Sequence, residues 1–347
     1  MELLALGLSH RTAPVAMRER ASLTPARATG LLRSLAADAG VLEAVALSTC
    51  NRTELYAVAR SRRHGIDALS AALLGATAIE TGELRRVRYV LSGDAVAEHL
   101  LRVSASLDSM VLGESEIQGQ VRRALVAAQD AGTVGPELRE LFRRALIAGK
   151  RVRRHTDLGR GAVSVAQAAV DLALRHVGDL GSSRALLLGA GRAAEATART
   201  LVGRGLGCLV VANRSEPSAA QIAKRFDGRA ASLGDLDDEL AAADIVVCST
   251  GSESTLVGIE SVRAALERRP GATIVLVDIA LPRDVEPGVR GLDGVVLIDL
   301  DDLDAVVREN AGQREREAVR AGFIVRAELR RYMRSRASVR APLHRAA

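Results

Sequence analysis

A glycine-rich turn between an apolar strand and a helix constrains the fold of this sequence most strongly. Residues 186–201 read LLLGAGRAAEATARTL, so three leucines lead into a GxGxxA pattern. In this pattern the first glycine allows a tight turn, the second lets the backbone approach a pyrophosphate, and the alanine permits close helix packing. The pattern predicts a dinucleotide site, and a purely structural turn is the alternative. The residues predicted to bind the cofactor here are Gly189, Ala190, Gly191, Arg192, Ala193 and Ala194.

The end of the next strand indicates which dinucleotide would bind. An acidic residue there usually holds the ribose hydroxyls of NAD, but this chain has Asn213, Arg214 and Ser215. An arginine at this place favours the 2′-phosphate of NADP. We therefore expect NADPH as the cofactor, with these three residues in its site, unless Arg214 is only a surface arginine.

The second half of the chain alternates strands and helices. Continuous apolar runs at residues 185–188, 209–212, 245–249, 273–278 and 295–298 are separated by helical patterns. Apolar strands interleaved with helices are typical of a parallel sheet covered on both faces. We predict a Rossmann-type domain over residues 159–300, which includes a connecting helix at 163–177.

The first half reads as an α+β unit with an antiparallel sheet. Short apolar runs occur at residues 2–8, 44–47, 54–59 and 88–91, and helical patterns near 66–74, 95–104, 117–131 and 137–154. A further helix is expected after Thr24 and Pro25, since threonine is a good N-cap and proline suits the first helical position. We assign residues 1–158 to a catalytic domain and residues 301–347 to a helical tail.

Charge is concentrated in two segments. The chain has 347 residues and a net charge of +6, enough length for two or three domains. Residues 308–347 hold 11 arginines and 4 glutamates, and residues 139–160 form a second basic run. These segments are either solvated helix faces or contacts for a polyanion such as RNA. With six aromatic residues in the chain, base stacking is not expected to hold a nucleic acid, and we expect no DNA partner.

The three cysteines are far apart and have no CxxC spacing, which fits a reducing cytoplasm and predicts no metal site. Cys208 and Cys248 lie on predicted strands and are expected to be buried. The sequence contains no long apolar run and no signal-peptide pattern, so we expect neither a membrane segment nor export.

Cys50 is the candidate nucleophile. It lies in ALSTCNRTELYAV, at a turn between two apolar strands and close to Arg52. A neighbouring guanidinium can lower the pKa of a thiol toward the nucleophilic thiolate. The alternative is an inert, buried cysteine.

Several separated motifs then point to one family. The chain resembles glutamyl-tRNA reductases over residues 1–300, because it has the motifs of that family in the expected order. In chain order these motifs are LGLSHRTAPVAMRER, ALSTCNRTELYAV, SLDSMVLGESEIQGQVRRAL, GKRVRRHTDLGRGAVSVAQAAVDLA and LLLGAGRAAE. The resemblance implies NADPH-dependent reduction of glutamyl-tRNA to glutamate-1-semialdehyde, the first step of tetrapyrrole synthesis. Cys50 would carry the glutamyl group as a thioester.

The resemblance also implies a set of site residues. His99 would orient the substrate or assist proton transfer, and Arg52 would pair with the substrate carboxylate. A homodimer and a glutamate-1-semialdehyde aminotransferase partner are further implications. The residues expected to line the glutamate pocket are Thr49, Asn51, Arg52, Ser109, Glu114, Ser115, Glu116 and Gln120.

The sequence departs from the family at a few positions, and two other functions stay open. Ser106 stands where glycine is common, Ser115 and Glu116 stand where proline and glutamine are common, and the tail is short. One alternative is an NADP-dependent dehydrogenase of a free small substrate, which would not need Cys50. The other is a catalytically idle tRNA- or partner-binding paralogue.

Overall fold

The computed structural model describes residues 1–347 except 111, 115, 160–164, 253, 304–314 and 341–347. The chain forms two compact units. Unit 1 comprises Met1–Ala162 together with Asn310–Ala347, and unit 2 comprises Val163–Glu309.

Unit 1 is built on an antiparallel sheet of β1 (Glu2–Ser9), β2 (Val41–Thr49), β3 (Arg52–Ala59) and β4 (Tyr89–Ser92), in the order β2-β3-β1-β4. Thr49 pairs with Arg52, and Ser9 also pairs with Arg52. The ends of three strands therefore meet at the two-residue turn that holds Cys50.

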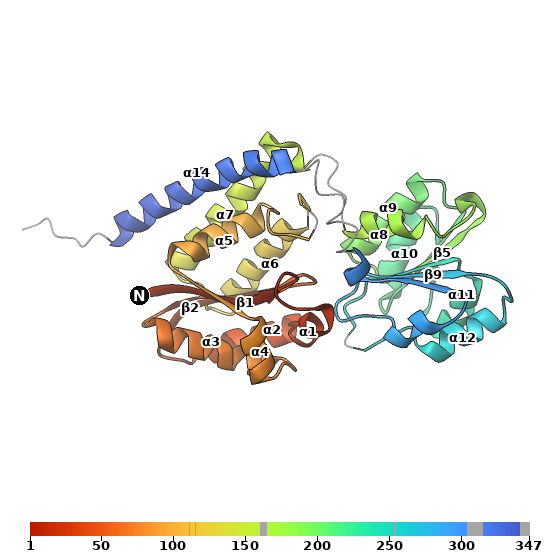
Figure 1. The fold of residues 1–347 in the computed structure, drawn as a ribbon, viewed down its shortest axis with the longest axis horizontal. Coiled ribbons are helices and arrows are strands. Elements are labelled where there is room, and N and C mark those ends of the chain that lie inside the picture. The colour runs from red at the N-terminus through yellow and green to blue at the C-terminus, as the bar shows by residue number, and fades with distance from the viewer. Residues whose placement is uncertain (111, 115, 160–164, 253, 304–314, 341–347) are drawn as a thin grey trace, which may run out of the picture. The chain divides into compact units, whose positions relative to one another are not determined.

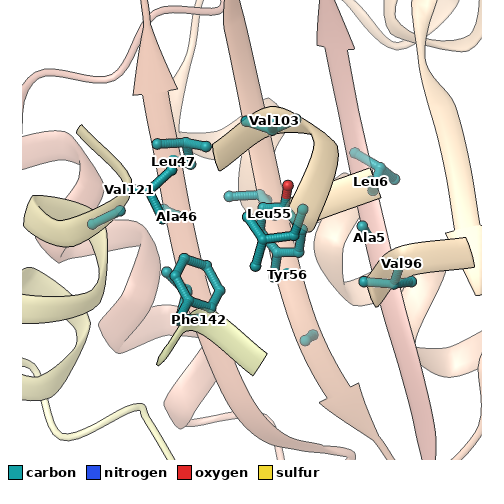
Figure 2. Close-up of a cluster of buried hydrophobic side chains, with 14 of the residues drawn as sticks. Ala5, Leu6, Ala46, Leu47, Leu55, Tyr56, Val96, Val103, Val121 and Phe142 are labelled. Carbon is teal, nitrogen blue, oxygen red and sulfur yellow. The ribbon is translucent and has the colours of Figure 1, made fainter. Parts of the chain in front are cut away.

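Helices cover both faces of this sheet (Figure 1). The helix predicted after Thr24 is confirmed, since the Thr24 hydroxyl accepts a hydrogen bond from the Arg27 amide at 3.3 Å. Tyr56 of β3 meets Phe142 edge-on, with ring centroids 5.4 Å apart, in the core between sheet and helices (Figure 2). One face carries α1 (Val15–Arg20), α2 (Pro25–Ala36), α3 (Arg62–Ala76) and α4 (Thr81–Val87), and the other carries α5 (Asp94–Ser104), α6 (Ile117–Asp130) and α7 (Pro136–His155). A short 3-10 turn, Asp157–Gly159, follows α7.

The C-terminal helix α14 (Glu315–Arg340) packs along α7 and α5 of unit 1 (Figure 1). Its Ala321, Val325 and Tyr332 are buried there. Glu328 is fully buried and pairs with Arg331 at 2.5 Å and with Arg151 of α7. Part of the basic run at residues 139–160 is therefore used inside the unit to hold α14.

Unit 2 is a parallel six-stranded sheet in the order β10-β9-β8-β5-β6-β7, the order of a Rossmann fold. Its strands, in chain order, are β5 (Arg184–Leu188), β6 (Cys208–Ala212), β7 (Arg229–Ala231), β8 (Ile245–Cys248), β9 (Ile274–Asp278) and β10 (Val295–Ile298). Its helices are α8 (Val165–Ala173), α9 (Arg192–Gly203), α10 (Glu216–Arg225), α11 (Leu236–Ala242) and α12 (Ile259–Glu267), with 3-10 turns at Leu180–Ser182, Leu233–Asp235 and Pro287–Gly291. The predicted fold class, an α+β unit, a Rossmann unit and a C-terminal helix, is confirmed.

Unit 2 differs from the sequence prediction in detail. The connecting helix ends at Ala173, because the amides of Arg175 and His176 bond three residues back, to Leu172 and Ala173, and so tighten the last turn. β7, α11 and α12 were not predicted. Cys248 is buried as expected, but Cys208 is exposed because it is the first residue of its strand. Within the described residues, no helix is both long enough and apolar enough to span a membrane.

Candidate active site and cofactor site

Cys50 and Asn51 form the turn that joins β2 to β3, and neighbouring groups fix this turn. The Thr49 hydroxyl accepts hydrogen bonds from the amides of Asn51 at 3.1 Å and Arg52 at 3.2 Å. The His10 amide donates to the Asn51 carbonyl at 2.8 Å. The thiol is thus held on a rigid turn, and Cys50 is half-buried.

Arg18, which the sequence analysis did not single out, reaches this turn from α1. Its Nη1 donates to the Cys50 carbonyl oxygen at 2.8 Å and to Asn51 Oδ1 at 3.3 Å. The residue is only 3% exposed. A buried, charged donor at this place therefore contacts the main chain of Cys50 itself.

The thiol of Cys50 is protonated at neutral pH in the substrate-free protein. Burial raises its pKa to about 12, with Glu114 and Glu116 adding to the increase and Arg18 opposing it. The sequence analysis expected a neighbouring guanidinium, that of Arg52, to lower this pKa. The pKa is instead raised, the guanidinium that opposes the increase is that of Arg18, and Arg52 pairs with two carboxylates.

Arg52 is 1% exposed and pairs with Glu54 and Asp108. Its Nη1 lies 2.7 Å from Glu54 Oε1 and 3.2 Å from Asp108 Oδ2, and its Nη2 donates to the Asp108 carbonyl. The other carboxylate oxygen of Asp108 pairs with Arg11 at 2.9 Å. Burial works against the charge of Arg52, but Glu54 and Asp108 hold its pKa above the ordinary value.

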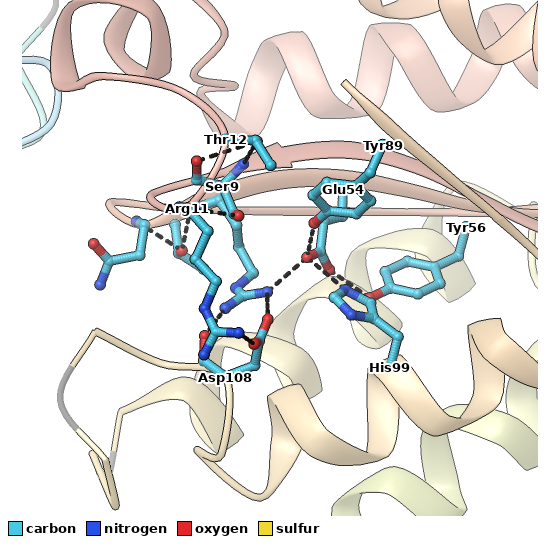
Figure 3. Close-up of polar contacts among 11 residues, drawn as sticks. Ser9, Arg11, Thr12, Glu54, Tyr56, Tyr89, His99 and Asp108 are labelled. Atoms are coloured by element: carbon cyan, nitrogen blue, oxygen red, sulfur yellow. Dashed lines mark hydrogen bonds and ion pairs between the residues drawn. The ribbon is translucent and has the colours of Figure 1, made fainter. Parts of the chain in front are cut away.

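Glu54 lies among Tyr56, Tyr89 and His99 (Figure 3), and it also pairs with Arg52. Its Oε1 accepts from the Tyr89 hydroxyl at 2.5 Å and from His99 Nε2 at 2.9 Å, and its Oε2 accepts from the Tyr56 hydroxyl. Burial disfavours the carboxylate, yet Arg52 and His99 outweigh it and hold the pKa of Glu54 well below its usual range. An ionised carboxylate can only accept hydrogen bonds, so His99 donates its Nε2–H to Glu54. The Nδ1 atom of His99 is then the unprotonated nitrogen and can accept a hydrogen bond or a proton.

Two further groups lie near the turn. Glu114 is 6% exposed, and burial together with Glu116 raises its pKa to about 7 against the effect of Arg52. Burial and Arg52 lower the pKa of His10 to about 4, so its ring is neutral, and its Nδ1 is buried with no hydrogen-bond partner among the described residues.

The other predicted pocket residues lie on the segment that leads into α6. Ser109 is buried and Gln120 is half-buried. The backbone N–H of Gln120 donates to the Glu116 carbonyl oxygen at 3.1 Å. Ser115 lies outside the described residues. Ser106 has φ +56°, a left-handed conformation that favours glycine, and its hydroxyl donates to the Glu114 carbonyl at 2.5 Å.

The glycine-rich turn of unit 2 fits a dinucleotide phosphate. Gly189 has φ +112°, and a Cβ there would lie 3.0 Å from the Ser249 carbonyl oxygen. A Cβ on Gly191 would meet nothing within 4 Å, and Gly191 caps α9 without a side-chain hydrogen bond. Ala194 is fully buried under the helix. The N-terminus of α9, where Arg192 is exposed and Ala193 half-buried, therefore begins beside open space at Gly191, as a pyrophosphate site requires.

The turn after β6 holds the groups predicted to select the cofactor. Arg214 is exposed, and no described residue forms a hydrogen bond or ion pair with it. Asn213 Nδ2 donates to the Ser215 carbonyl at 3.2 Å, and the Ser215 and Ser218 hydroxyls lie 2.9 Å apart.

The two turns of the cofactor site are neighbours at one edge of the sheet. The Gly189 amide donates to the Ala212 carbonyl at 2.9 Å, so the end of β6 lies beside the glycine-rich turn. Ala190, the next residue of that turn, is half-buried. One dinucleotide can therefore contact both turns.

The fold and these two sites define a class, a nicotinamide-dependent oxidoreductase. The comparisons with known proteins agree. Residues 6–156 match the family model of the glutamyl-tRNA(Glu) reductase N-terminal domain, and residues 171–306 match that of shikimate/quinate 5-dehydrogenase.

Relatives narrow the class to one family. Glutamyl-tRNA reductase from Rubrobacter xylanophilus is 47% identical over 92% of this chain and 74% of its own length. The Bacillus subtilis protein of that name is 39% identical over 94% of this chain and 71% of its own length. The solved structure of glutamyl-tRNA reductase from Methanopyrus kandleri is 33% identical, with a TM-score of 0.52 over 97% of this chain and 81% of that one.

The chain belongs to the glutamyl-tRNA reductase family. It is an oxidoreductase, and the reaction of this family is the first committed step of tetrapyrrole synthesis. The dehydrogenase of a free small substrate and the idle paralogue are not favoured.

Proposed function

We propose that this chain reduces glutamyl-tRNA to glutamate-1-semialdehyde with NADPH, through a thioester on Cys50. The observation that carries the proposal is the position of Cys50, at a rigid turn where Arg18 and His10 make hydrogen bonds and where the charge of Glu114 acts. The proposal assigns catalysis to Cys50 and His99.

The first chemical step has to remove the thiol proton. With a pKa of about 12, the Cys50 thiol needs a base at neutral pH, and Glu114, with a pKa of about 7, is available in both protonation states. His99 Nδ1 is the second candidate, because Nε2 is bonded to Glu54. The sulfur then bonds to the glutamyl carbonyl carbon, the ester C–O bond breaks, and the tRNA hydroxyl leaves with a proton.

The nicotinamide cofactor, when bound to unit 2, supplies the hydride for reduction of the thioester to the aldehyde. The protein contributes the phosphate-facing amides of α9 and, at the 2′-phosphate, Arg214. The family's shikimate-type nucleotide-binding region supports a nicotinamide cofactor, and the exposed Arg214 is the reason to expect NADPH.

The pocket for the glutamyl group is proposed to use groups around the Cys50 turn. The hydrogen bonds of Arg52 to Glu54 and Asp108 do not use all five N–H donors of a guanidinium, so it can still donate to a carboxylate. Glu116, half-buried at the start of α6, offers a partner for the substrate ammonium. The proposed pocket residues are Thr49, Asn51, Arg52, Ser109, Glu114, Ser115, Glu116 and Gln120.

A homodimer and docking of glutamate-1-semialdehyde aminotransferase belong to the same proposal. Val319 and Phe323 are 59% and 62% exposed and lie one turn apart on α14, which supports an apolar contact there. Sedimentation of the wild type against a Val319→Ser/Phe323→Ser variant tests the dimer, which should dissociate more readily in the variant.

Single-turnover reduction tests the function. Enzyme, NADPH and a panel of charged tRNAs are mixed, and the product aldehyde is identified by mass. Glutamyl-tRNA should give glutamate-1-semialdehyde, and Cys50→Ser should give none. NADPH oxidation that survives in Cys50→Ser would instead support a dehydrogenase without an acyl-enzyme.

A further inference from the structure

A buried arginine from a short helix contacts the turn that carries Cys50. Arg18 lies on α1, and its Nη1 contacts the Cys50 carbonyl oxygen at 2.8 Å and Asn51 Oδ1 at 3.3 Å. Both contacts are to the turn itself, 32 and 33 residues away in sequence. Hydrogen bonds of a charged donor are among the stronger ones in proteins, so this contact restricts the main chain of the nucleophile.

The charge of Arg18 is opposite in sign to the carboxylates that act on the Cys50 thiol. Apart from burial, the groups acting on the thiol are the carboxylates of Glu114 and Glu116, which disfavour a thiolate, and Arg18, which favours it. Arg52 balances Glu54 and Asp108 and is not among these groups. Within the part of the chain that the structure describes, Arg18 is therefore the main positive charge acting on the forming thiolate.

We propose that Arg18 is the positioning residue of the nucleophile, fixing the Cys50 main chain and stabilising the sulfur anion as the proton leaves. This rests on the proposed role of Cys50. When the base takes the Sγ proton, negative charge appears on sulfur, and the buried guanidinium stabilises it without having to reorganise. As the thioester forms, that charge passes to the departing tRNA oxygen and is neutralised by the proton.

Alkylation of Cys50 by iodoacetamide, followed by peptide mass spectrometry on the full chain, tests the charge effect. Because the Cys50 pKa lies far above an assay pH of about 8, the fraction of reactive thiolate falls about tenfold for each unit by which that pKa rises. Arg18→Gln should slow alkylation at least about tenfold. The exposed Cys208, read in the same samples, should be alkylated at an unchanged rate.

Two variants bracket this result. Arg20→Gln removes another arginine of α1, one that pairs with Glu83 at 2.7 Å, and should leave Cys50 alkylation within about twofold of wild type. Glu114→Gln removes a charge that raises the pKa and should accelerate alkylation. A Cys50 rate in Arg18→Gln equal to that of wild type overturns the inference.

Arg18→Lys separates charge from geometry and serves if the glutamine variant does not fold. Lysine keeps the charge but loses the planar fork, so alkylation should stay within about threefold while thioester formation slows at least about tenfold. If alkylation of Cys50 in Arg18→Lys slows by about tenfold or more, the loss expected for Arg18→Gln, the inference is contradicted. These alkylation measurements need no tRNA, so failure of the proposed function is seen separately, as absence of a glutamyl adduct on the wild type.

Discussion

Cys50 and Arg52 are two residues apart in sequence but have different hydrogen-bond and ion-pair partners. Cys50 lies in the turn with Arg18, whereas the Arg52 side chain is buried beside β3 and neutralised by Glu54 and Asp108. The carboxylate of Glu54 then links Arg52 to Tyr89 and His99. A substitution of Glu54 should therefore affect both Arg52 and His99, the two predicted site residues that it contacts.

Glu54→Gln should lower the free energy of unfolding of unit 1 by about 3–5 kcal/mol, because it leaves the buried Arg52 charge less balanced. Because the pKa of Glu54 is lowered in the folded state, its contribution is full above the pKa of a free glutamate. The contribution is lost progressively as the pH falls from there through the lower pKa of the folded state. The variant's deficit, measured by urea unfolding, should accordingly shrink in acid.

Glu98→Gln is the matched control, since Glu98 is exposed beside His99 on α5 and should change stability by less than about 0.5 kcal/mol. An equal, small effect of both variants would mean that the Glu54 network does not stabilise the unit.

Arg214→Ala should weaken NADPH binding by roughly 1.5–3 kcal/mol and leave NADH nearly unchanged. The guanidinium makes a charge-assisted contact only when the 2′-phosphate is present. Calorimetric titration of both cofactors measures this difference. Equal losses for the two would show that Arg214 has a structural role instead.

At the scale of elements, what is local in sequence could be predicted and what is distant could not. The turn at Gly189 and Gly191 needs only its own strand and helix, and the Thr24 cap needs only the next turn. The hydrogen-bond partners of Glu54 come from β3, β4 and α5 and lie up to 45 residues away in sequence, so no spacing in the sequence reveals them. Arg18 was missed for the same reason. Cys50 was a candidate from its own turn, and the resemblance supplied His99 and the thioester; the roles of both residues stay predictions.

The helix α14 packs on α5 and α7 of unit 1, so a substitution that disrupts this packing should destabilise unit 1. Tyr332 is 1% exposed, and Tyr332→Ala should cost about 3–5 kcal/mol of unfolding free energy in unit 1. Hydrogen exchange should show faster exchange in α5 and α7, while cofactor binding by unit 2 stays as in wild type. Faster exchange confined to α14 itself would mean that the helix is not part of the core of unit 1.

At the scale of the whole molecule, the basic run at residues 139–160 divides into two groups. Arg143 and Arg144 pair with Glu140, and Arg151 pairs with Glu328, so these arginines already have partners. Lys150 and Arg154 are exposed on α7, and none of the described residues pairs with them. The second group is the better candidate for contacts with tRNA phosphates.

A Lys150→Gln/Arg154→Gln variant should bind tRNA with a flatter dependence on salt, by roughly 0.7–0.9 in the log–log slope for each phosphate that the protein no longer neutralises. Filter binding over a range of salt concentrations measures the slope. Arg85→Gln/Arg86→Gln, which removes two exposed arginines of α4, is the control. Identical slopes in all three proteins would mean that α7 is a solvated face.

If Cys50 carries the glutamyl group, a covalent adduct should form before any reduction. The most direct measurement mixes the enzyme with glutamyl-tRNA in the absence of NADPH and reads the intact mass, followed by peptide mapping. We expect one glutamyl adduct on Cys50, none on Cys208 or Cys248, none in Cys50→Ser, and loss of the adduct when NADPH is added. An active preparation that forms no adduct on Cys50 would contradict the covalent mechanism.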